Sequence, residues 1–516
     1  MHKQTHKRND DNSLRSWLVF VATAVALSVI VWLVWSVAAH RSVLPGISSA
    51  QSSASVSVGL TDAPDSLDIR TDAAPAVERA LLGNVYETLV TRDDDNAIKP
   101  GLAKSWKVSD DGLTYTFTLN SGMRFSNGDA LDSSDVVWSL QQIVQNKYQG
   151  VSALNALKSV TNPNATTVEL MLSHTDPTLL RALSGRAGIA YDAQANQDYA
   201  TAAFGSGPFT LAKYDKGSSI ELTRNEQYWG DQSAAERVTL RYYDDEATMV
   251  KDLQDGKLDM ALPTNTDATN ALVNDAKFTV KTGSSTAKVM LAFNNDGNSI
   301  FSDQQARQAI RYAVDTKSIA GSRSDSAGAL GGPIGQLEPG YEDLTELFPF
   351  DQAKSVSMIS YFATGAAYFG AINFVVPQSY ESLGKTVTEQ LQAVGLTVNM
   401  QVTDDATAAQ RVKDGQYEVA ITVTDGTDDA AAFGTADNVY RYTNGEAQSA
   451  WTNAMAATND KDYQDRLHDF AHTVSQDAAC DWLYTKKTVV AAASSVTGYS
   501  TNITDRYLPL AKVTVK

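Results

Sequence analysis

The sequence predicts a mixed α/β protein in which helices flank β-sheets. Stretches of alternating apolar and polar residues, typical of half-buried strands, follow one another with stretches of helical spacing between them. The 516 residues, 43% of them hydrophobic, suffice for a large core and for two or three domains. The sequence contains no fixed-period repeat and no second long apolar run after the N-terminal one.

The first 39 residues carry a membrane-anchoring pattern. Residues 1–16 include several basic side chains and are expected to lie in the cytoplasm, ahead of the apolar residues 17–39. About twenty apolar residues span a bilayer, so 17–39 is expected to be a single-pass transmembrane signal anchor at the cell membrane. Cleavage near Ala38 is the alternative. Residues 40–55, rich in Ser and Ala, are expected to form a flexible linker to an extracytoplasmic domain.

The exported part shows strand and helix patterns in alternation. Gly and Asx residues mark the turns, and Asp side chains stand where helices are expected to begin. The predicted elements are, in order, strands at 56–60, 219–224, 237–243, 258–262, 289–294, 396–402 and 417–424, and helices at 76–89, from Asp245 to Asp255, from Asp303 and at 384–394.

The block at 103–135 is the most informative of these stretches. Gly112 ends a hairpin turn signal, and residues 114–119 then alternate hydroxyl and apolar side chains, which predicts a half-buried strand. Asp132 or Ser133 is positioned to cap the helix that follows. The block therefore predicts a hairpin followed by a helix.

Charge and cysteine content exclude several classes of protein. The net charge of −18 argues against nucleic-acid binding, because a phosphate backbone would be repelled. Acidity of this kind mainly favours solubility, with a preference for cationic ligands as the alternative. Cys480 is the single cysteine, so an intrachain disulfide, a thiolate metal cluster and a lipid anchor behind the apolar run are excluded. We expect Cys480 to be a core residue.

No catalytic motif is supported by the sequence. His468 and His472 are spaced as on the helix of a zinc protease, but an Asp stands where the general base would be Glu. A nucleophile elbow and a phosphate-binding loop are absent from the sequence. We therefore expect no catalytic residue, no bound metal and no cofactor, and keep a zinc hydrolase only as a remote alternative.

Seven further blocks, together with 103–135, resemble those of the family 5 solute-binding proteins, the peptide, dipeptide and nickel receptors of ABC importers. They occur in the expected order and cover nearly the whole exported chain. The blocks are GSGPF at 205–209, NEQYWG at 225–230, LQDGKLDMA at 253–261, LAFNN at 291–295, QARQAIRYAVD at 305–315, LQAVGLTVNMQ at 391–401 and VTGY at 496–499.

The resemblance implies a two-lobed fold of the periplasmic-binding-protein type II kind with an additional inserted α/β domain. Lobe I would comprise residues 56–82, 190–290 and 488–516, and lobe II residues 291–487. The inserted domain would comprise residues 83–189 and carry the 103–135 block, which we expect on the scaffold rather than at the ligand's charged end. The hinge would be crossed near Asn294 and residue 488, and closure would bury the ligand.

The resemblance also directs attention to the acidic loop after the strand at 417–424. In peptide-binding members, the corresponding strand leads to a Trp and to an Asp that pairs with the α-ammonium of the peptide. This sequence has no Trp at 421–424 and has Asp429-Ala430 in place of Asp-Pro, so which carboxylate takes the role stays open. The predicted ligand-binding residues are Thr424, Asp425, Gly426, Asp428, Asp429, Phe433 and Asn294.

The resemblance thus implies a receptor that captures oligopeptides by lobe closure, without catalysis, and delivers them to the transmembrane subunits of an ABC permease. An oligosaccharide or a metal chelate is the alternative cargo. A degenerate receptor acting as a sensor or scaffold is the alternative from another class, since the Trp and the Asp-Pro are missing.

Overall fold

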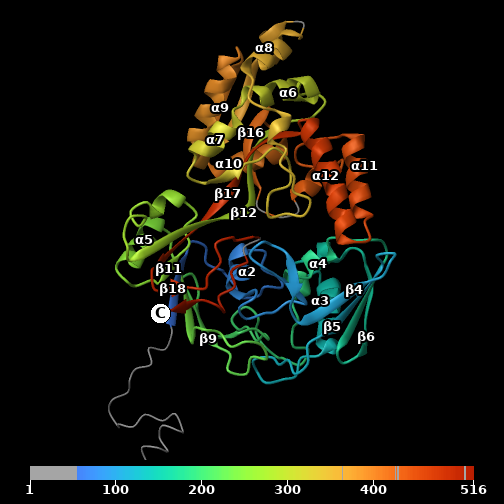
Figure 1. The fold of residues 1–516 in the computed structure, drawn as a ribbon, viewed down its shortest axis with the longest axis vertical. Helices are drawn as coiled ribbons and strands as arrows, with labels where there is room; N and C mark the ends of the chain where they lie inside the picture. The colour runs from blue at the N-terminus through green and yellow to red at the C-terminus, as the bar shows by residue number, and fades with distance from the viewer. Residues whose placement is uncertain (1–54, 363, 425, 427–428, 505–506) are drawn as a thin grey trace, which may run out of the picture. The chain divides into compact units, whose positions relative to one another are not determined.

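The computed structural model describes residues 55–516 except 363, 425, 427–428 and 505–506 (Figure 1). The predicted cytoplasmic segment, the anchor and all but the last residue of the linker lie outside these residues. Within the part that is described, no helix combines the length and the apolarity that crossing a membrane requires.

The predicted α/β class is confirmed. Eleven strands of the described chain form one sheet, with helices on its faces, and a separate four-stranded sheet lies in the 89–190 segment (Figure 1). The path through the large sheet is β15-β14-β16-β12-β17-β11-β1-β10-β9-β8, with β13 paired to β17 off this path. The sheet therefore has two halves, and the neighbouring strands β12 (Phe278–Phe293) and β17 (Cys480–Ala493) join them.

The β12–β17 pair is antiparallel and runs through both halves. Phe278 to Ser284 pair with residues 487–493 of β17, and Lys288 to Ala292 pair with residues 480–485. The register shifts between these two ladders. Ser284 pairs with Lys487 and Lys288 pairs with Thr485, so β12 advances by four residues while β17 advances by two. Such a bulge bends a strand and increases its twist, so the change of direction between the halves lies here.

The first half of the sheet is built from β1 near the start of the described chain, from strands between residues 209 and 261, and from parts of β12 and β17. The parallel β1–β10 pairing places Val58 opposite Leu240, and both side chains are buried in one core with Val490 and Leu510. The elements are β1 (Ser55–Leu60), β8 (Phe209–Asp215), β9 (Ser219–Arg224), β10 (Arg237–Tyr242), β11 (Met260–Ala261), α2 (Pro75–Leu81) and α5 (Glu246–Gln254), with β18 (Val496–Thr497) and β19 (Thr514–Val515) pairing beside them.

The helix predicted over 76–89 is too long, because α2 ends at Leu81. Gly83 follows with φ of +74°, and the ring of Tyr507 occupies the place where a Cβ of residue 83 would stand, 2.6 Å away. The apolar spacing continues past this point, but the buried Val85 belongs to a turn and the buried Tyr86 forms an isolated β-bridge with Leu82. The helix from Asp245 is confirmed, since the Asp245 side chain caps α5 and Gly256 follows its end.

The 89–190 segment has its own core and contains the hairpin block as predicted. Strand β5 alternates buried and half-buried residues, and Gly112 has φ of +70° in the preceding turn. Asp132 accepts from Ser134 N at 2.7 Å and Asp135 accepts from Asp132 N at 3.0 Å, a capping box that begins α3. The elements are β2 (Val90–Arg92), β3 (Ile98–Pro100), β4 (Ala103–Val108), β5 (Thr114–Leu119), α3 (Ser133–Asn146), β6 (Leu157–Asn164), β7 (Thr167–Leu172) and α4 (Leu179–Ala182).

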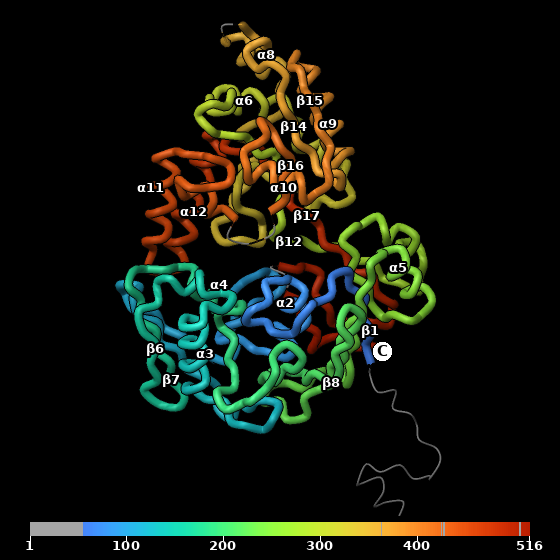
Figure 2. Tube along the Cα trace, turned by 180° about the vertical axis from the view of Figure 1, so that it is seen from behind, coloured from blue at the N-terminus to red at the C-terminus, as the bar shows by residue number. Residues whose placement is uncertain are grey.

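The second half of the sheet lies between two helical layers. Alternate residues of β12 face opposite layers, so Leu291 packs with α6 and α9 while Met290 packs with the core beneath α11 and α12, two helices that lie side by side (Figure 2). The elements are α6 (Gln304–Ala313), α7 (Thr316–Ser322), β13 (Ser326–Ala329), α8 (Gln352–Ser360), β14 (Ala371–Pro377), α9 (Glu381–Ala393), β15 (Thr397–Thr403), α10 (Asp405–Asp414), β16 (Val419–Thr424), α11 (Gly445–Met455) and α12 (Asp460–Gln476).

Glu87 is a largely enclosed carboxyl group that accepts two hydrogen bonds from the loop between β9 and β10. Tyr228 Oη donates to its Oε1 at 2.8 Å and Trp229 Nε1 donates to its Oε2 at 2.7 Å. Burial raises the pKa of Glu87 from 4.5 to about 7, against the lowering effect of these hydrogen bonds. The folded protein therefore holds a proton here that the unfolded chain releases between about pH 4.5 and 7.

We predict that Glu87→Gln flattens the pH dependence of stability. The raised pKa of Glu87 adds on the order of 1–3 kcal/mol to the free energy of unfolding below about pH 4.5, and this contribution is lost as the pH rises through about 7. Urea unfolding at pH 5 and pH 8 should show a smaller fall in the free energy of unfolding for the variant. Glu226→Gln, at an exposed position, is the control. Its free energy of unfolding should fall between pH 5 and pH 8 as much as that of the native protein, and an equal fall for Glu87→Gln would contradict the prediction.

Candidate functional site

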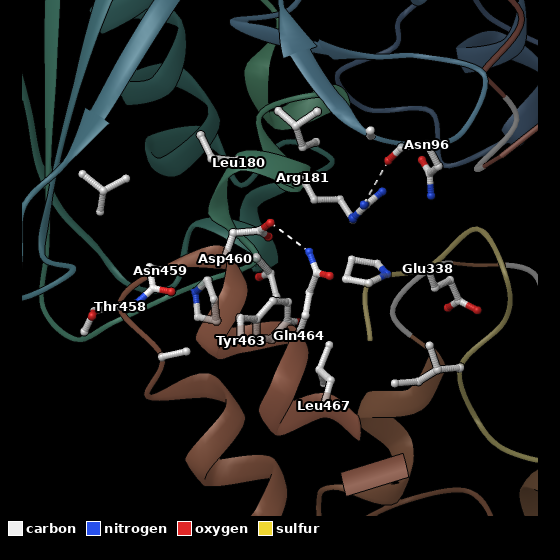
Figure 3. A pocket seen from close by; sticks show the side chains of 18 of the residues that line it. Asn96, Leu180, Arg181, Glu338, Thr458, Asn459, Asp460, Tyr463, Gln464 and Leu467 are labelled. Carbon is white, nitrogen blue, oxygen red and sulfur yellow. Dashed lines mark hydrogen bonds between the residues drawn. The ribbon is translucent and has the colours of Figure 1, made fainter. Parts of the chain in front are cut away.

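A cavity of about 760 Å³ lies between the 89–190 segment and the second half of the large sheet (Figure 3). Pockets that hold small ligands typically measure about 300–1,000 Å³. Its lining combines aromatic and aliphatic side chains with many polar and charged ones. These features make the cavity the candidate ligand site of the described chain.

One wall comes from the 89–190 segment. The β4–β5 hairpin contributes Trp106, Asp110 and Tyr115, and Leu180 and Arg181 follow from α4. Tyr115 Oη donates to Asp176 O at 3.2 Å, which fixes its ring at the wall. The 103–135 block, expected on the scaffold rather than at the ligand's charged end, therefore also supplies side chains to the cavity.

The opposite wall is formed by the loop at 334–339, by residues 430–431 and by the α11–α12 corner. Asn459 caps α12 by accepting from Asp462 N at 3.0 Å, which places Asp460 in the first turn. Gln464 Nε2 donates to Asp460 Oδ2 at 2.8 Å (Figure 3). Tyr463 and Leu467 are four residues apart on this helix, so both face the cavity.

Two hydrogen bonds connect the walls directly. Asn96 Nδ2 donates to Leu337 O at 2.7 Å, and Thr175 Oγ1 donates to Met455 O at 2.9 Å. Both partners of each bond lie in or next to segments that line the cavity. The two bonds therefore hold the walls together on either side of the cavity.

Asn96 is the more constrained of these connections. Its φ of +62° is left-handed, a region that Asn tolerates better than most residues, and its side chain is almost completely buried. Its Oδ1 accepts from Arg92 Nη1 at 3.3 Å and from Thr504 Oγ1 at 3.2 Å. Its carbonyl accepts from Arg181 Nη2 at 3.2 Å (Figure 3). The side chain and the carbonyl of this one residue thus connect Arg92, Arg181 and Thr504 to the opposite wall.

A buried ion pair lies at the base of this second wall. Lys288, on β12 at the bulge, approaches Glu338 Oε2 at 2.8 Å, and both side chains are at most 2% exposed. Asp429 Oδ2 stands 3.6 Å from the same ammonium and Gly335 N donates to Glu338 Oε2 at 2.6 Å. Burial raises the pKa of Glu338 to about 8 and Asp429 adds to the rise, while Lys288 opposes it.

The structure describes only part of the acidic loop predicted to bind ligand. Asp425 and Asp428 lie outside the described residues. Asp429 begins a short 3₁₀ helix, Asp429–Phe433, and its carboxylate faces Lys288 and accepts from Gly426 N at 3.1 Å. Thr424 ends β16 opposite Lys288, so Thr424, Gly426 and Asp429 lie together beside the buried ion pair.

Phe433 and Asn294 occupy different surroundings. Phe433 is 2% exposed and stacks on Tyr440 at 5.1 Å between ring centroids, inside the core beneath α11 and α12. Asn294 follows the far end of β12 and donates to Gly415 O at 3.2 Å and to Tyr417 O at 3.0 Å. Neither residue is among those that line the cavity.

The two histidines considered for zinc chemistry lie on α12, where His472 is exposed and His468 is half-buried. Throughout the described residues, no group of three or more His, Cys, Asp and Glu side chains is arranged to hold a metal ion. The remote hydrolase alternative therefore gains no support from the geometry of this helix.

The family model of the bacterial extracellular solute-binding proteins, family 5 (Middle), matches residues 97–446. The chain belongs to this family. The match confirms the resemblance drawn from the sequence blocks. It includes most of the first wall of the cavity and the 334–339 and 430–431 parts of the second, whereas the lining residues from Trp451 onward lie beyond it.

Relatives and solved structures agree with this assignment. Heme-binding protein A of Haemophilus influenzae is 27% identical over 310 residues, covering 54% of this chain and 56% of that protein, so the match spans about half of that relative. Oligopeptide-binding protein AppA of Bacillus subtilis is 23% identical over 484 residues, covering 86% and 88%. The ABC transporter substrate-binding protein CtaP of Listeria monocytogenes superposes with a TM-score of 0.80 at 21% identity, covering 89% and 99%. The predicted two-lobed fold class is thereby confirmed.

Most of the cavity lining was not anticipated from the sequence. The aromatic side chains of Trp106, Tyr115, Trp451 and Tyr463 and the buried Lys288–Glu338 pair come from distant segments. The one available signal was the Lys at position 288 directly before the apolar strand residues 289–293, since a lysine in a buried strand requires a partner.

We predict that Asn96→Asp favours separation of the two walls. Asp keeps the left-handed backbone and the acceptor toward Arg92, but loses the donor to Leu337 O and places a carboxylate against that carbonyl. Losing such a bond costs roughly 1–3 kcal/mol. Small-angle scattering should give a larger radius of gyration for the variant than for the native protein.

Asn120→Asp is the matched control for this prediction. The Asn120 amide donates to Gly101 O at 2.9 Å and Leu102 O at 3.1 Å, entirely within the 89–190 segment. This variant should lose stability without a change in the radius of gyration. If Asn96→Asp scatters like Asn120→Asp, the bond to Leu337 does not hold the walls together.

Proposed function

We propose that the chain is a membrane-tethered receptor that captures oligopeptides in this cavity and delivers them to an ABC permease. The observation that carries the proposal is the cavity of about 760 Å³ with mixed aromatic and polar walls that belong to separate parts of the fold. Family membership supports delivery to a permease, since solute-binding proteins of this family serve transport. Residues 17–39 would hold the receptor at the membrane, with the described part outside the cell.

A peptide suits the character of the walls. Aromatic and aliphatic side chains accept varied side chains of a cargo, and hydrated pockets tolerate differences among them. The 334–339 loop and the α11–α12 corner line the cavity, and we expect their backbone groups to pair with an extended peptide. No covalent step is needed, so the proposed receptor acts by capture and release and is not an enzyme.

The likeness to AppA, a protein named for oligopeptide binding, supports peptide over other cargo because it extends over 88% of that relative. The relative named for heme binding is matched over only 56% of its length. Heme, oligosaccharides and metal chelates are therefore the comparison ligands. A scaffold that binds no small solute is the alternative from another class.

We predict that the full chain binds short peptides with free N-termini and that one of Asp425, Asp428 and Asp429 pairs with the peptide's α-ammonium. Replacing that residue by Ala should weaken binding at least about tenfold, because a charge-assisted hydrogen bond is lost. Binding of a peptide pool, heme, an oligosaccharide and a nickel chelate is measured by isothermal titration calorimetry. The fluorescence of Trp106 and Trp451, which line the cavity, provides a second readout.

An N-acetylated copy of the same peptide is the control for this experiment. It lacks the ammonium, so it should bind weakly to the native protein and equally weakly to the decisive Ala variant. Unchanged affinity in all three Ala variants would refute the assignment of the loop. Binding of heme or another comparison ligand in preference to every peptide would refute the peptide cargo, and no binding at all would favour the scaffold.

A further inference from the structure

The charges along the described lining of the cavity are unbalanced. Four lining residues carry carboxyl groups and one carries a guanidinium, the acidic ones being Asp95, Asp110, Glu338 and Asp460 and the basic one Arg181. Just behind the lining, Asp429 and Lys288 add one charge of each sign. Carboxyl groups thus outnumber basic groups by five to two around the described part of the cavity. When the Lys288–Glu338 ion pair is set aside, the remaining carboxyl groups outnumber the basic groups by four to one.

We propose that the cavity selects cargo with a positively charged side chain, that is, basic peptides. This inference rests on the proposed function and narrows it to one substrate class. Taking a carboxylate out of water is costly unless a cation compensates for it, so closure over an acidic wall is most favourable with a cationic cargo.

Two lysines next to lining carboxylates are engaged with other carboxylates. Lys461, next to Asp460, pairs with Asp465 one turn further along α12. Lys99, beside the Asp95 turn, pairs with Asp93 at 2.9 Å. Neither lysine is among the residues that line the cavity. Glu338 has Lys288 as its partner, so the charges of Asp95, Asp110 and Asp460 are the ones left to be met by solvent or by the cargo.

The beginning of α12 would by itself favour an anion, but its residues offset this tendency. Asn459 accepts from Asp462 N, so part of the exposed N–H groups is already satisfied. Asp460 and Asp462 stand in the first turn and oppose the partial positive charge of the helix end. The net effect at this corner is therefore acidic.

The aromatic side chains provide a second reason to expect a cationic cargo. Four of them line the cavity together with aliphatic groups, namely Trp106, Tyr115, Trp451 and Tyr463 with Val108, Leu180, Ile334 and Leu467. The face of a Trp or Tyr ring attracts an ammonium or guanidinium group within about 6 Å. Aliphatic neighbours suit the methylene stem of Lys or Arg, whose charged head then reaches the carboxylates.

The test compares three tripeptides that differ only in the charge of the central side chain. The full chain is titrated with Ala-Lys-Ala, Ala-Gln-Ala and Ala-Glu-Ala at low and at high salt. We expect the Lys peptide to bind at least about tenfold more tightly than the Gln peptide and the Glu peptide most weakly. The preference should shrink at high salt, because screening weakens exposed charge interactions.

Two conservative variants locate the effect. Asp110→Asn and Asp460→Asn should each reduce the preference for Lys over Gln several-fold, and Asn at position 460 keeps the acceptor for Gln464. Asp469→Asn is the matched control, since Asp469 is exposed on the same helix and does not line the cavity. It should leave the preference unchanged.

The outcomes separate this inference from the proposed function. Equal affinity for the three tripeptides, or tighter binding of the Glu peptide, would overturn the charge selection while leaving peptide capture intact. A charge preference that survives in both Asp→Asn variants would also overturn it. Absence of binding for every peptide would overturn the proposed function itself.

Discussion

The antiparallel pairing of β12 with β17 is the interaction on which the remaining architecture depends. Side chains of these two strands enter four of the five apolar cores found among the described residues, because alternate residues face opposite sides of the sheet. Val490 and Ala492 belong to the first half, whereas Leu291 and Trp482 belong to the second. The bulge between Ser284 and Lys288 lies between these two sets. Any movement of the halves must therefore be accommodated within a few residues whose neighbours on both sides are fixed by packing.

The position of Lys288 connects this constraint with the cavity. The residue belongs to the sheet through its backbone and reaches the cavity wall through its ammonium, which pairs with Glu338. A buried pair of this kind contributes little net stability compared with apolar side chains, but leaving either partner alone is costly. We therefore infer that the pair fixes the 334–339 loop in relation to the bulge. The 334–339 loop of the cavity wall and the bulge of β12 are thus coupled through the Lys288–Glu338 pair.

Local sequence was sufficient for the parts of the fold that local physics determines. The alternation at 114–119 and the cap at Asp132 appear as predicted, because each depends on residues within one turn or one strand. The helix at 76–89 was overestimated, since Tyr507, more than 400 positions away, packs where the helix would continue past Gly83. The cavity was largely missed for the same reason. Trp106 and Tyr463 line the same cavity only after both sheets have formed, and no residue spacing in the sequence indicates that they do.

Cys480 is the single thiol of the chain, fully buried at the start of β17 opposite Ala292. Burial raises its pKa to about 12, so in the folded protein it is neither accessible nor ionised. A thiol-reactive dye would consequently label the native chain only when β17 leaves the sheet, and the labelling rate would measure the opening of the strand pair itself. Cysteines introduced on the two cavity walls would, by contrast, be labelled without background from the native residue.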